Sequence, residues 1–494
     1  MVTITRINLS RCLFSATKDS EIEFCKESLR VYVDGCFFSK LYKEGKWDGY
    51  HKFFDTKNYF DYGLQDELCY HLNEEGIKFE IKTNYVEFKL KIDIDERMRY
   101  YQNESIKKFY KNSVGIIKVP PRGGKTFIAS EMFRISSLIY LNEKEKFLFV
   151  VDTEDLFKQA VNDISEYLQI SKEEIGMINS RKQIFKKINV AMIQTMVSTF
   201  YGRAKNKDKI KKLNLFLLNL NFLAVDEVHE HSSVKRINVF KKCKKLKNLC
   251  AFSGTPFKQF TEIQNLTIKG FFGGIIFDIP KQELQKEGFL TMDKVFLMHI
   301  DHKKSTEFAP CESYNEFLSH YIHDNNYRNA VLCEIINVCM KNKWKTLVLF
   351  NSVIHGKIIR DEMDLPFISG SDKGEVRDEA KSNFLKGKGK VLLASNIFKK
   401  GITLPEAQIL IIADGGLEGS NITQKYSRVL GTSEGKSSSA VIDLMDTGVK
   451  HFKEHSLNRL EIYDLEMEGR VEVYNDFEIS TMSESINEWL TTSK

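Results

Sequence analysis

The hydrophobic positions of this chain form short, unbroken apolar runs separated by amphipathic stretches of helical length. From residue 94 to about 280 these runs end in polar turns, and the same style returns from Trp344 to Asp446. Unbroken apolar runs are typical of parallel strands that are covered by helices on both faces. The pattern therefore predicts an α/β fold with two parallel-sheet lobes in tandem. The expected strands include residues 114–119, 216–225, 346–350, 390–394 and 408–412.

The first 92 residues follow a different pattern. Short aromatic and β-branched runs at 30–33, 78–81 and 86–90 are mixed with helical stretches such as 63–73. Such a mixture predicts a small α+β domain over residues 1–92, and we expect this domain to recognise the substrate.

The remaining boundaries follow from changes in this pattern. We predict a first lobe over residues 93–290, a hinge or connector over 291–330, a second lobe over 331–475 and an acidic tail over 476–494. Residues 483–489 of the tail are expected to form a short helix that docks back or recruits a protein partner.

Two motifs in the first lobe carry the chemistry. The segment Pro120-Pro121-Arg122-Gly123-Gly124-Lys125-Thr126 follows a predicted strand and precedes a predicted helix. Glycines at such a turn let backbone N–H groups surround phosphates, a lysine reaches the same oxygens, and a hydroxyl coordinates Mg²⁺. Lys125 and Thr126 fill the last two positions, so the segment predicts an ATP site.

The second motif is Asp226-Glu227-Val228-His229, which ends the apolar run 216–225. We expect Asp226 to hold the water shell of Mg²⁺ and Glu227 to orient the attacking water. A glycine pair before a lysine is often only a helix-capping turn, and acids often begin a helix. Val119 also stands where the long phosphate-loop pattern has its first glycine, so the prediction depends on both motifs occurring in this order.

The charge of the chain is uneven. The 494 residues carry 73 bases and 67 acids, for a net charge of +6. Residues 457–494 hold 9 acids and 3 bases, which leaves 70 bases and 58 acids in residues 1–456. A basic body suits a polyanionic partner, although lysine-rich surfaces also serve solubility.

The cysteines and the N-terminus indicate the compartment. The nine cysteines form no Cys-x-x-Cys pair and no zinc-ligand spacing, so we expect reduced, mostly buried thiols. The first residues do not read as a signal peptide, and no apolar segment is long enough to span a bilayer. We therefore expect a soluble, cytoplasmic protein.

The motifs taken together resemble those of the superfamily 2 helicases, over roughly residues 95–450. Their order is residues 99–102, the phosphate loop, 151–153, 193–195, 226–229, 253–256, 394–395 with 400–402, and 424–428. Residues 354–356, 368–370, 394–402 and 459–463 look more narrowly like the phage UvsW-like branch, which is related to XPB and RecG-type motors. The resemblance implies two RecA-like lobes, ATP and Mg²⁺ as cofactors, and DNA as partner.

The resemblance also assigns roles to single residues. Arg99, Tyr101 and Gln102 would bind adenine, since an amide offers a donor and an acceptor to the base edge. Gly123, Gly124, Lys125, Thr126 and Gly401 complete the expected nucleotide site. His229, Ser253 and Thr255 would couple this site to the nucleic acid.

A third group of residues would grip one nucleic-acid strand through its phosphates, without reading bases. Each of these residues has a turn or helix-cap role as an equal alternative. They are Thr153, Gln194, Thr195, Ser369 and Ser395. In the N-terminal domain, Trp47 lies in an aromatic and basic stretch suited to stacking at a junction, and a hairpin anchor is the alternative.

Arg428 is the expected arginine finger, with Gln424 one helical turn before it. It would neutralise charge on the γ-phosphate from the second lobe. Three positions depart from the family: Gly431 replaces a second arginine, Ser427 a glycine, and Arg122 a small residue.

The expected function is an ATP-dependent DNA helicase or translocase that remodels forks, Holliday junctions or R-loops, working as a monomer. An RNA helicase or a restriction-type motor is an alternative in the same class. Gly431 keeps open a third reading, a nucleic-acid binding or annealing protein with weak ATPase activity.

Overall fold

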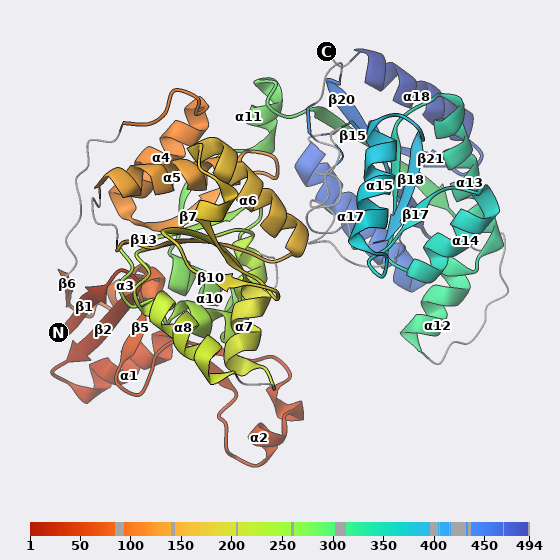
Figure 1. The fold of residues 1–494 in the computed structure, drawn as a ribbon. Coiled ribbons are helices and arrows are strands. Elements are labelled where there is room, and N and C mark those ends of the chain that lie inside the picture. The colour runs from red at the N-terminus through yellow and green to blue at the C-terminus, as the bar shows by residue number, and fades with distance from the viewer. Residues whose placement is uncertain are drawn as a thin grey trace. The chain divides into compact units, whose positions relative to one another are not determined.

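A computed structural model shows the fold (Figure 1) and describes residues 1–83, 93–139, 144–203, 206–257, 261–301, 313–395, 404, 406–413, 415, 431–432, 436–467 and 469–492. By its internal contacts the chain divides into two units, Met1–Pro280 and Lys281–Lys494. The predicted strand at 86–90 lies outside the described residues.

The N-terminal domain is built on a four-stranded sheet in the order β5-β2-β1-β6. β1 pairs antiparallel with β2 and parallel with β6, so the sheet is mixed. The inward side chains of β1 and β2 pack with those of two helices, and Val2, Ile4 and Phe14 are fully buried. The elements are β1 Val2–Asn8, β2 Arg11–Ala16, α1 Asp19–Ser28, β5 Tyr59–Asp61, η2 Tyr62–Leu64, α3 Gln65–Glu74 and β6 Phe79–Thr83.

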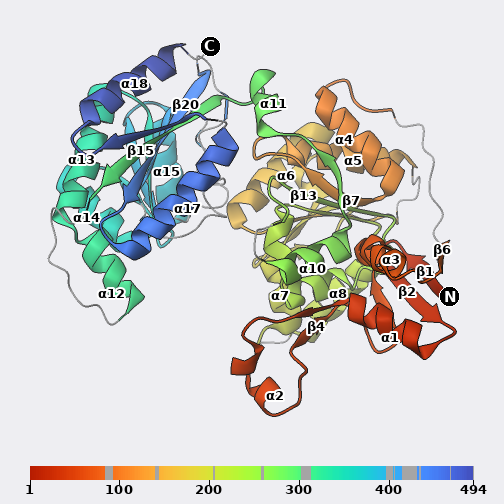
Figure 2. The same ribbon diagram turned by 180° about the vertical axis from the view of Figure 1, so that it is seen from behind.

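A two-stranded ribbon extends from this domain (Figures 1 and 2). β3 (Arg30–Tyr32) pairs antiparallel with β4 (Tyr50–Lys52). Between them lie η1 (Cys36–Phe38) and the short helix α2 (Lys40–Lys43).

The first parallel sheet has eight strands in the order β10-β9-β11-β8-β12-β13-β7-β14. All neighbours run parallel except β10, which pairs antiparallel with β9. Its strands are β7 Val114–Lys118, β8 Phe147–Val151, β9 Ile175–Ile178, β10 Gln183–Ile184, β11 Ile188–Met192, β12 Phe222–Val225, β13 Asn248–Ser253 and β14 Ile275–Asp278.

Helices connect these strands, and the central strands β8, β12 and β13 are buried along their whole length. The helices are α4 Tyr100–Asn112, α5 Lys125–Ile139, α6 Glu154–Leu168, η3 Lys172–Glu174, α7 Ile193–Tyr201, α8 Lys207–Leu218, η4 Val228–His231, α9 Val234–Phe240 and α10 Glu262–Phe272. The predicted run 216–225 is a strand only from Phe222, because its first residues end α8 and Asn219 and Asn221 form the connection.

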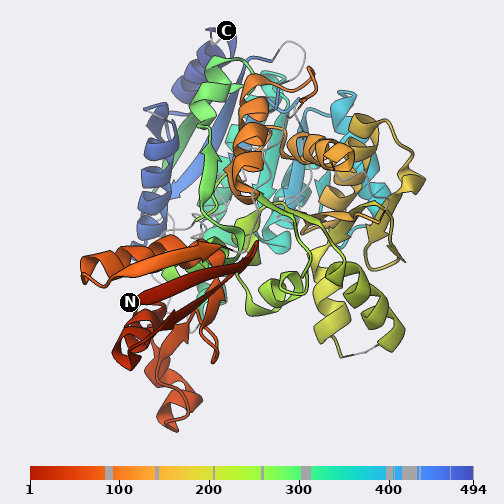
Figure 3. The ribbon, with the colours of Figure 1, turned by 90° about the vertical axis from the view of Figure 1, so that its left-hand side faces the viewer.

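The N-terminal domain lies beside the first parallel sheet in the same unit and packs against helix α10 of that unit (Figure 3). Leu266 of α10 contacts the core of the small domain. A β-carbon on Gly63 would lie 1.8 Å from the carbonyl oxygen of Lys269, so only glycine allows this close approach. Lys269 also pairs with Glu67, and Lys241 with Asp61.

The second unit holds a seven-stranded, entirely parallel sheet in the order β17-β18-β16-β19-β20-β15-β21. The strands are β15 Met292–Ile300, β16 Thr346–Phe350, β17 Phe367–Ile368, β18 Val391–Ser395, β19 Ile409–Ile412, β20 Ser438–Asp446 and β21 Val471–Asn475. The helices are α11 Lys281–Lys286, α12 Tyr314–Leu318, the π-helical η6 Ser319–His323, α13 Asn326–Lys341, α14 Val353–Met363, α15 Gly374–Leu385, α17 Lys450–Met467 and α18 Ile479–Thr492.

Two tandem parallel sheets confirm the predicted fold class, but the boundaries around the second sheet were wrong. The predicted connector 291–330 contains β15, which lies between β20 and β21 in the sheet. The predicted tail 476–494 is not separate either, because α18 buries Ile479, Met482 and Ile486 in the core of this unit. The second unit therefore begins at Lys281 and includes both segments.

No helix in the described parts of the chain combines the length and the apolar character needed to cross a bilayer.

Candidate nucleotide and nucleic-acid site

The phosphate-loop motif lies where β7 ends and α5 begins. Lys125 is the first residue of α5, and the preceding turn is closed by the N–H of Gly123, which donates to the carbonyl of Pro120 at 3.0 Å. Gly124 has a φ of +79°, and a β-carbon there would lie 2.4 Å from Nε2 of Gln102. Glycine is therefore needed at this position for both its backbone conformation and its size. Arg122 adopts a φ of +73°, which is unusual for a residue with a side chain.

The second motif follows β12, a neighbour of β13 in the same sheet. Nζ of Lys125 donates to Oε1 of Glu227 at 2.6 Å and lies 4.0 Å from Oδ1 of Asp226. Both motifs therefore meet at the carboxyl edge of the parallel strands, which is where ligands bind in such sheets. The backbone of Glu227 has a φ of +46°, so a left-handed turn separates the two carboxylates.

Burial and charge act in opposite directions on these three groups. Burial raises the pKa of Asp226 to about 6, although the ammonium of Lys125 opposes the rise. Burial would also raise the pKa of Glu227, but Lys125 and His229, with the hydrogen bond from Ser253, together hold that pKa below its usual value. The carboxylates in turn raise the pKa of Lys125 against the effect of burial. The site thus keeps a charged lysine next to an ionised Glu227.

The donor set fits a hard divalent cation. Oδ1 of Asp226 is buried and, among the described residues, has no hydrogen-bond partner. A buried carboxylate oxygen without a donor is costly, and Mg²⁺ with its waters would satisfy it. Thr126 lies next to Lys125 at the start of α5, where its hydroxyl is the expected second ligand.

A chain of hydrogen bonds connects Glu227 to the end of β13. Nδ1 of His229 lies 2.8 Å from Oγ of Ser253 and 3.4 Å from Oε2 of Glu227. Oγ of Ser253 donates to Oε2 of Glu227 at 3.4 Å and accepts from the N–H of Thr255 at 3.0 Å. The three residues with expected coupling roles are therefore joined to one another and to the acidic motif.

The residues expected to bind adenine contact the phosphate loop directly. The hydroxyl of Tyr101 and Nε2 of Gln102 both donate to the carbonyl of Gly123, at 2.9 and 3.3 Å. Oε1 of Gln102 accepts from the N–H of Arg99 at 3.0 Å, and Nη1 of Arg99 donates to the Tyr101 hydroxyl at 3.2 Å. The start of α4 is thereby fixed against the loop.

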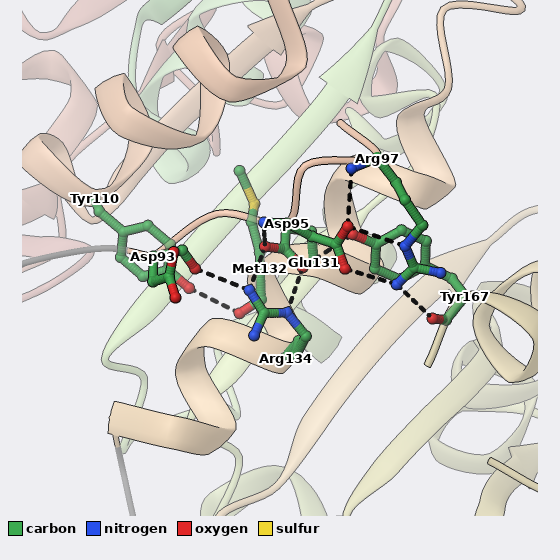
Figure 4. A network of polar contacts seen from close by, with 8 residues as sticks. All are labelled: Asp93, Asp95, Arg97, Tyr110, Glu131, Met132, Arg134 and Tyr167. Atoms are coloured by element: carbon green, nitrogen blue, oxygen red, sulfur yellow. Dashed lines mark hydrogen bonds and ion pairs between the residues drawn. The ribbon is translucent and has the colours of Figure 1, made fainter. Parts of the chain in front are cut away.

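Sequence reasoning missed a buried network that joins α5, α6 and the segment before α4 (Figure 4). The carboxylate of Glu131, on α5, is fully buried and accepts from the N–H of Asp95 at 2.8 Å and from the hydroxyl of Tyr167 at 3.0 Å. Arg134 donates twice to it, each time at 2.7 Å. Arg97 lies over the ring of Tyr167 at 4.5 Å. An acid inside the apolar stretch 127–132 was the only signal in the sequence.

The residues expected to contact nucleic acid follow the carboxyl ends of strands in both sheets. Thr153 follows β8, Thr195 lies in the first turn of α7 after β11, and Ser369 follows β17. Thr153 also caps α6 by accepting from the N–H of Leu156 at 3.4 Å, as the alternative reading expected. Ser369 donates to Asp372 at 3.0 Å.

The other two residues of this group differ in exposure. Gln194 is exposed after β11, whereas Ser395, at the end of β18, is buried and its hydroxyl has no partner among the described residues. Trp47 is half-buried, and its indole N–H donates to the carbonyl of Tyr50 at 2.9 Å. That bond anchors the turn before β4. Arg428, Gln424 and Gly401 lie outside the described residues.

Two family models match the chain. Residues 95–258 match the model described as type III restriction enzyme, res subunit, and residues 327–430 match the helicase conserved C-terminal domain. The matches cover the phosphate loop, the acidic motif and strands β16 to β19 of the second sheet.

Two relatives match over most of their length. The ATP-dependent DNA helicase uvsW of Enterobacteria phage T4 is 22% identical over 88% of this chain and 88% of its own. The DNA 3'-5' translocase XPB2 of Sulfurisphaera tokodaii is 22% identical over 81% of this chain and 92% of its own. Among solved structures, an HsdR subunit fragment of a type I restriction enzyme from Vibrio vulnificus is 16% identical, covers 83% of this chain and 74% of that chain, and has a TM-score of 0.57. The structural likeness supports the two-sheet fold.

Proposed function

Because the chain belongs to the superfamily 2 helicases, we propose that it is an ATP-dependent DNA helicase or translocase that acts on branched DNA. One observation carries the proposal: the ammonium of Lys125 lies 2.6 Å from Glu227 at the carboxyl edge of a parallel sheet. The names of the relatives support DNA, and the UvsW-like motifs favour forks, Holliday junctions or R-loops as substrates.

Bound ATP would supply the phosphoryl group, and Mg²⁺ would neutralise negative charge on the phosphates. Lys125 would exchange its contact with Glu227 for the β- and γ-phosphate oxygens, since both partners are anionic. Release of that contact frees Glu227 to orient the attacking water. Asp226 and Thr126 would hold the cation, while Tyr101, Gln102 and Arg99 would bind the base.

The second unit would complete the reaction. We propose Arg428 as the arginine finger, with Gln424 beside it and Gly401 as a further nucleotide contact. Hydrolysis would then depend on the second unit approaching the first, and loss of the γ-phosphate would release it.

Nucleic-acid contact is proposed at the same carboxyl edges. His229, Ser253 and Thr255 would transmit the state of Glu227 to the strand-binding residues. The latter are Thr153, Gln194, Thr195, Ser369 and Ser395. We propose that the β3–β4 ribbon contacts the DNA junction and that Trp47 contributes by holding the ribbon in shape.

Two observations favour alternative functions. An RNA helicase and a restriction-type motor use the same two-sheet fold, and one matching structure belongs to a restriction enzyme subunit. Gly431 removes a second arginine, which favours slow hydrolysis and a binding or annealing role. We further propose a cytoplasmic monomer that binds Mg²⁺ with ATP.

The test measures ATP hydrolysis with no nucleic acid, duplex DNA, branched DNA and RNA. Lys125→Ala is the inactive control. Strongest stimulation by branched DNA supports the proposal. Stimulation by RNA alone assigns the RNA class, and binding of branched DNA without any stimulated hydrolysis assigns the binding protein.

A further inference from the structure

The connection between α9 and β13 concentrates positive charge. Residues 241–247 read Lys-Lys-Cys-Lys-Lys-Leu-Lys, and the whole segment from Ser232 to Thr261 contains no Asp or Glu. Cys243 is buried, while Lys241, Lys244 and Lys245 are exposed. The nucleotide mechanism uses none of these lysines.

Two contacts show at which edge of the sheet this connection lies. Lys247 donates to Oε1 of Glu145, just before β8, at 2.8 Å, and Lys245 donates to Oδ1 of Asn219, just before β12, at 2.9 Å. Both partners precede the amino ends of strands, whereas Lys125 and Glu227 follow carboxyl ends. A strand of four or five residues at about 3.3 Å each separates the two edges by roughly 15 Å.

Other elements of the first unit bring further positive side chains close to residues 241–247. Lys241 contacts Asp61 of the N-terminal domain at 2.8 Å, and Nζ of Lys242 lies 4.6 Å from the ring centre of Phe200 on α7. Burial and then the charge of Arg11 lower the pKa of Lys244, so Arg11 of the small domain lies near these lysines, where its Nη2 also pairs with Oδ2 of Asp55 at 2.5 Å. α8, whose end contacts Lys245, exposes four more lysines at 207, 209, 211 and 212.

Within the described residues, Lys242, Lys244 and Lys245 form no ion pair with a carboxylate, so their charge remains available. Residues 241–247, all of them described, also expose no large apolar or aromatic side chain that would stack on a base. Lysines are point charges that suit phosphates without reading sequence.

We propose that this basic edge, defined as Arg11, Lys241, Lys242, Lys244 and Lys245, binds the phosphate backbone of duplex DNA at a second site, on the sheet edge opposite the nucleotide. The inference rests on the proposed function, because it takes DNA as the substrate. A duplex arm held there would be fixed to the first unit through a complete cycle of hydrolysis.

The experiment compares the full chain with the variant Lys242→Gln, Lys244→Gln, Lys245→Gln. Binding to a fluorescent DNA junction with long duplex arms is measured across salt concentrations. We expect the slope of log K against log salt to become shallower by about 2 to 3, since each lost phosphate contact removes about 0.9. Hydrolysis stimulated by a short single strand should stay at the wild-type rate.

Two matched variants complete the design. Lys158→Gln, Lys172→Gln, Lys341→Gln removes three exposed lysines elsewhere and should leave the slope unchanged. Lys242→Arg, Lys244→Arg, Lys245→Arg keeps the charge and should retain the wild-type slope. Equal slopes for the wild type and the first glutamine variant would overturn the proposal and favour an acidic protein as the partner of this edge. Failure of the proposed function would differ, because the wild type would then hydrolyse ATP no faster with DNA than without it.

Discussion

Nζ of Lys125 lies 2.6 Å from Oε1 of Glu227, so the lysine expected to hold phosphate also pairs with the acid expected to orient water. In the proposed mechanism the ammonium of Lys125 pairs first with Glu227 and then with the phosphates of ATP. We expect Lys125→Ala to lower ATP hydrolysis by about 10²–10³-fold, as for loss of one transition-state donor. Steady-state hydrolysis with saturating branched DNA measures this. A variant that kept the wild-type rate would remove Lys125 from the mechanism.

The raised pKa of Asp226 predicts a pH-dependent change in stability. Its folded pKa of about 6 exceeds the reference value of 3.8, so ionising this buried carboxyl opposes folding above pH 6 and has no effect below both values. Asp226→Asn should therefore increase the free energy of unfolding by about 1–3 kcal/mol at pH 7.5. The gain should shrink as the pH falls from 6 to 4.

Denaturant unfolding at several pH values tests this expectation, and ATP hydrolysis should be lost in the same variant because a ligand of the cation is gone. The expectation fails if Asp226→Asn destabilises the protein at pH 7.5. Asp324→Asn, on an exposed turn in the second unit, is the matched control.

Gly124 tests the contact between the phosphate loop and Gln102. Alanine there must adopt a φ of +79° and would place its methyl group 2.4 Å from the Gln102 amide. We therefore expect Gly124→Ala to lower the free energy of unfolding by about 1–2 kcal/mol. Displacement of Gln102 should also raise the KM for ATP by roughly tenfold or more. Gly274→Ala is the control, because its β-carbon would meet nothing within 4 Å. Equal KM values for both variants would contradict a role for Gln102.

Glu131 should position the adenine-binding segment without touching the nucleotide. Glu131→Ala removes the acceptor for the N–H of Asp95 and for Arg134, and should cost about 1–3 kcal/mol of stability. We expect the KM for ATP to rise while kcat changes little, because Lys125 and Glu227 stay in place. Glu131→Gln keeps an acceptor and should recover part of the affinity. A fall in kcat with an unchanged KM would instead place Glu131 in the chemical step.

His355, in the second unit, predicts acid sensitivity. Burial, and then the charge of Arg328, hold its pKa well below 6.5, and its Nε2 lies 2.9 Å from Oδ1 of Asn329. Above about pH 6.5 this histidine is neutral in both the folded and the unfolded chain. As the pH falls below about 6.5, the unfolded chain binds a proton that the folded chain does not, so the free energy of unfolding decreases. His355→Gln should therefore flatten the dependence of unfolding free energy on pH between 6.5 and 5. Unchanged pH dependence in the variant would show that other groups cause it.

The fold class could be predicted because buried parallel strands leave unbroken apolar runs, as in β7, β16 and β18. β15 was missed as a strand because the run that contains it continues into polar residues, so the pattern suggested a connector. α18 was assigned to a tail by its acidic charge, although its apolar side chains are spaced for burial.

The core of the site was equally visible, since Lys125 and Glu227 stand in motifs whose chemistry constrains their spacing. The network around Glu131 was not visible, because its partners Asp95 and Tyr167 lie 36 residues away on either side along the chain. The basic edge joins segments as distant as Arg11 and Lys244. Long-range pairing of this kind leaves no periodic signal in one sequence.

The position of β15 between β20 and β21 has a consequence for synthesis on the ribosome. The first unit is complete when β14 has emerged, but the second sheet needs its last strand and α18, about 200 residues later. At about 5–20 residues per second, this interval lasts roughly 10–40 s. During it, an already folded nucleotide site would be tethered to apolar strands still waiting for their neighbours, which makes that nascent stretch a target for chaperones and proteases.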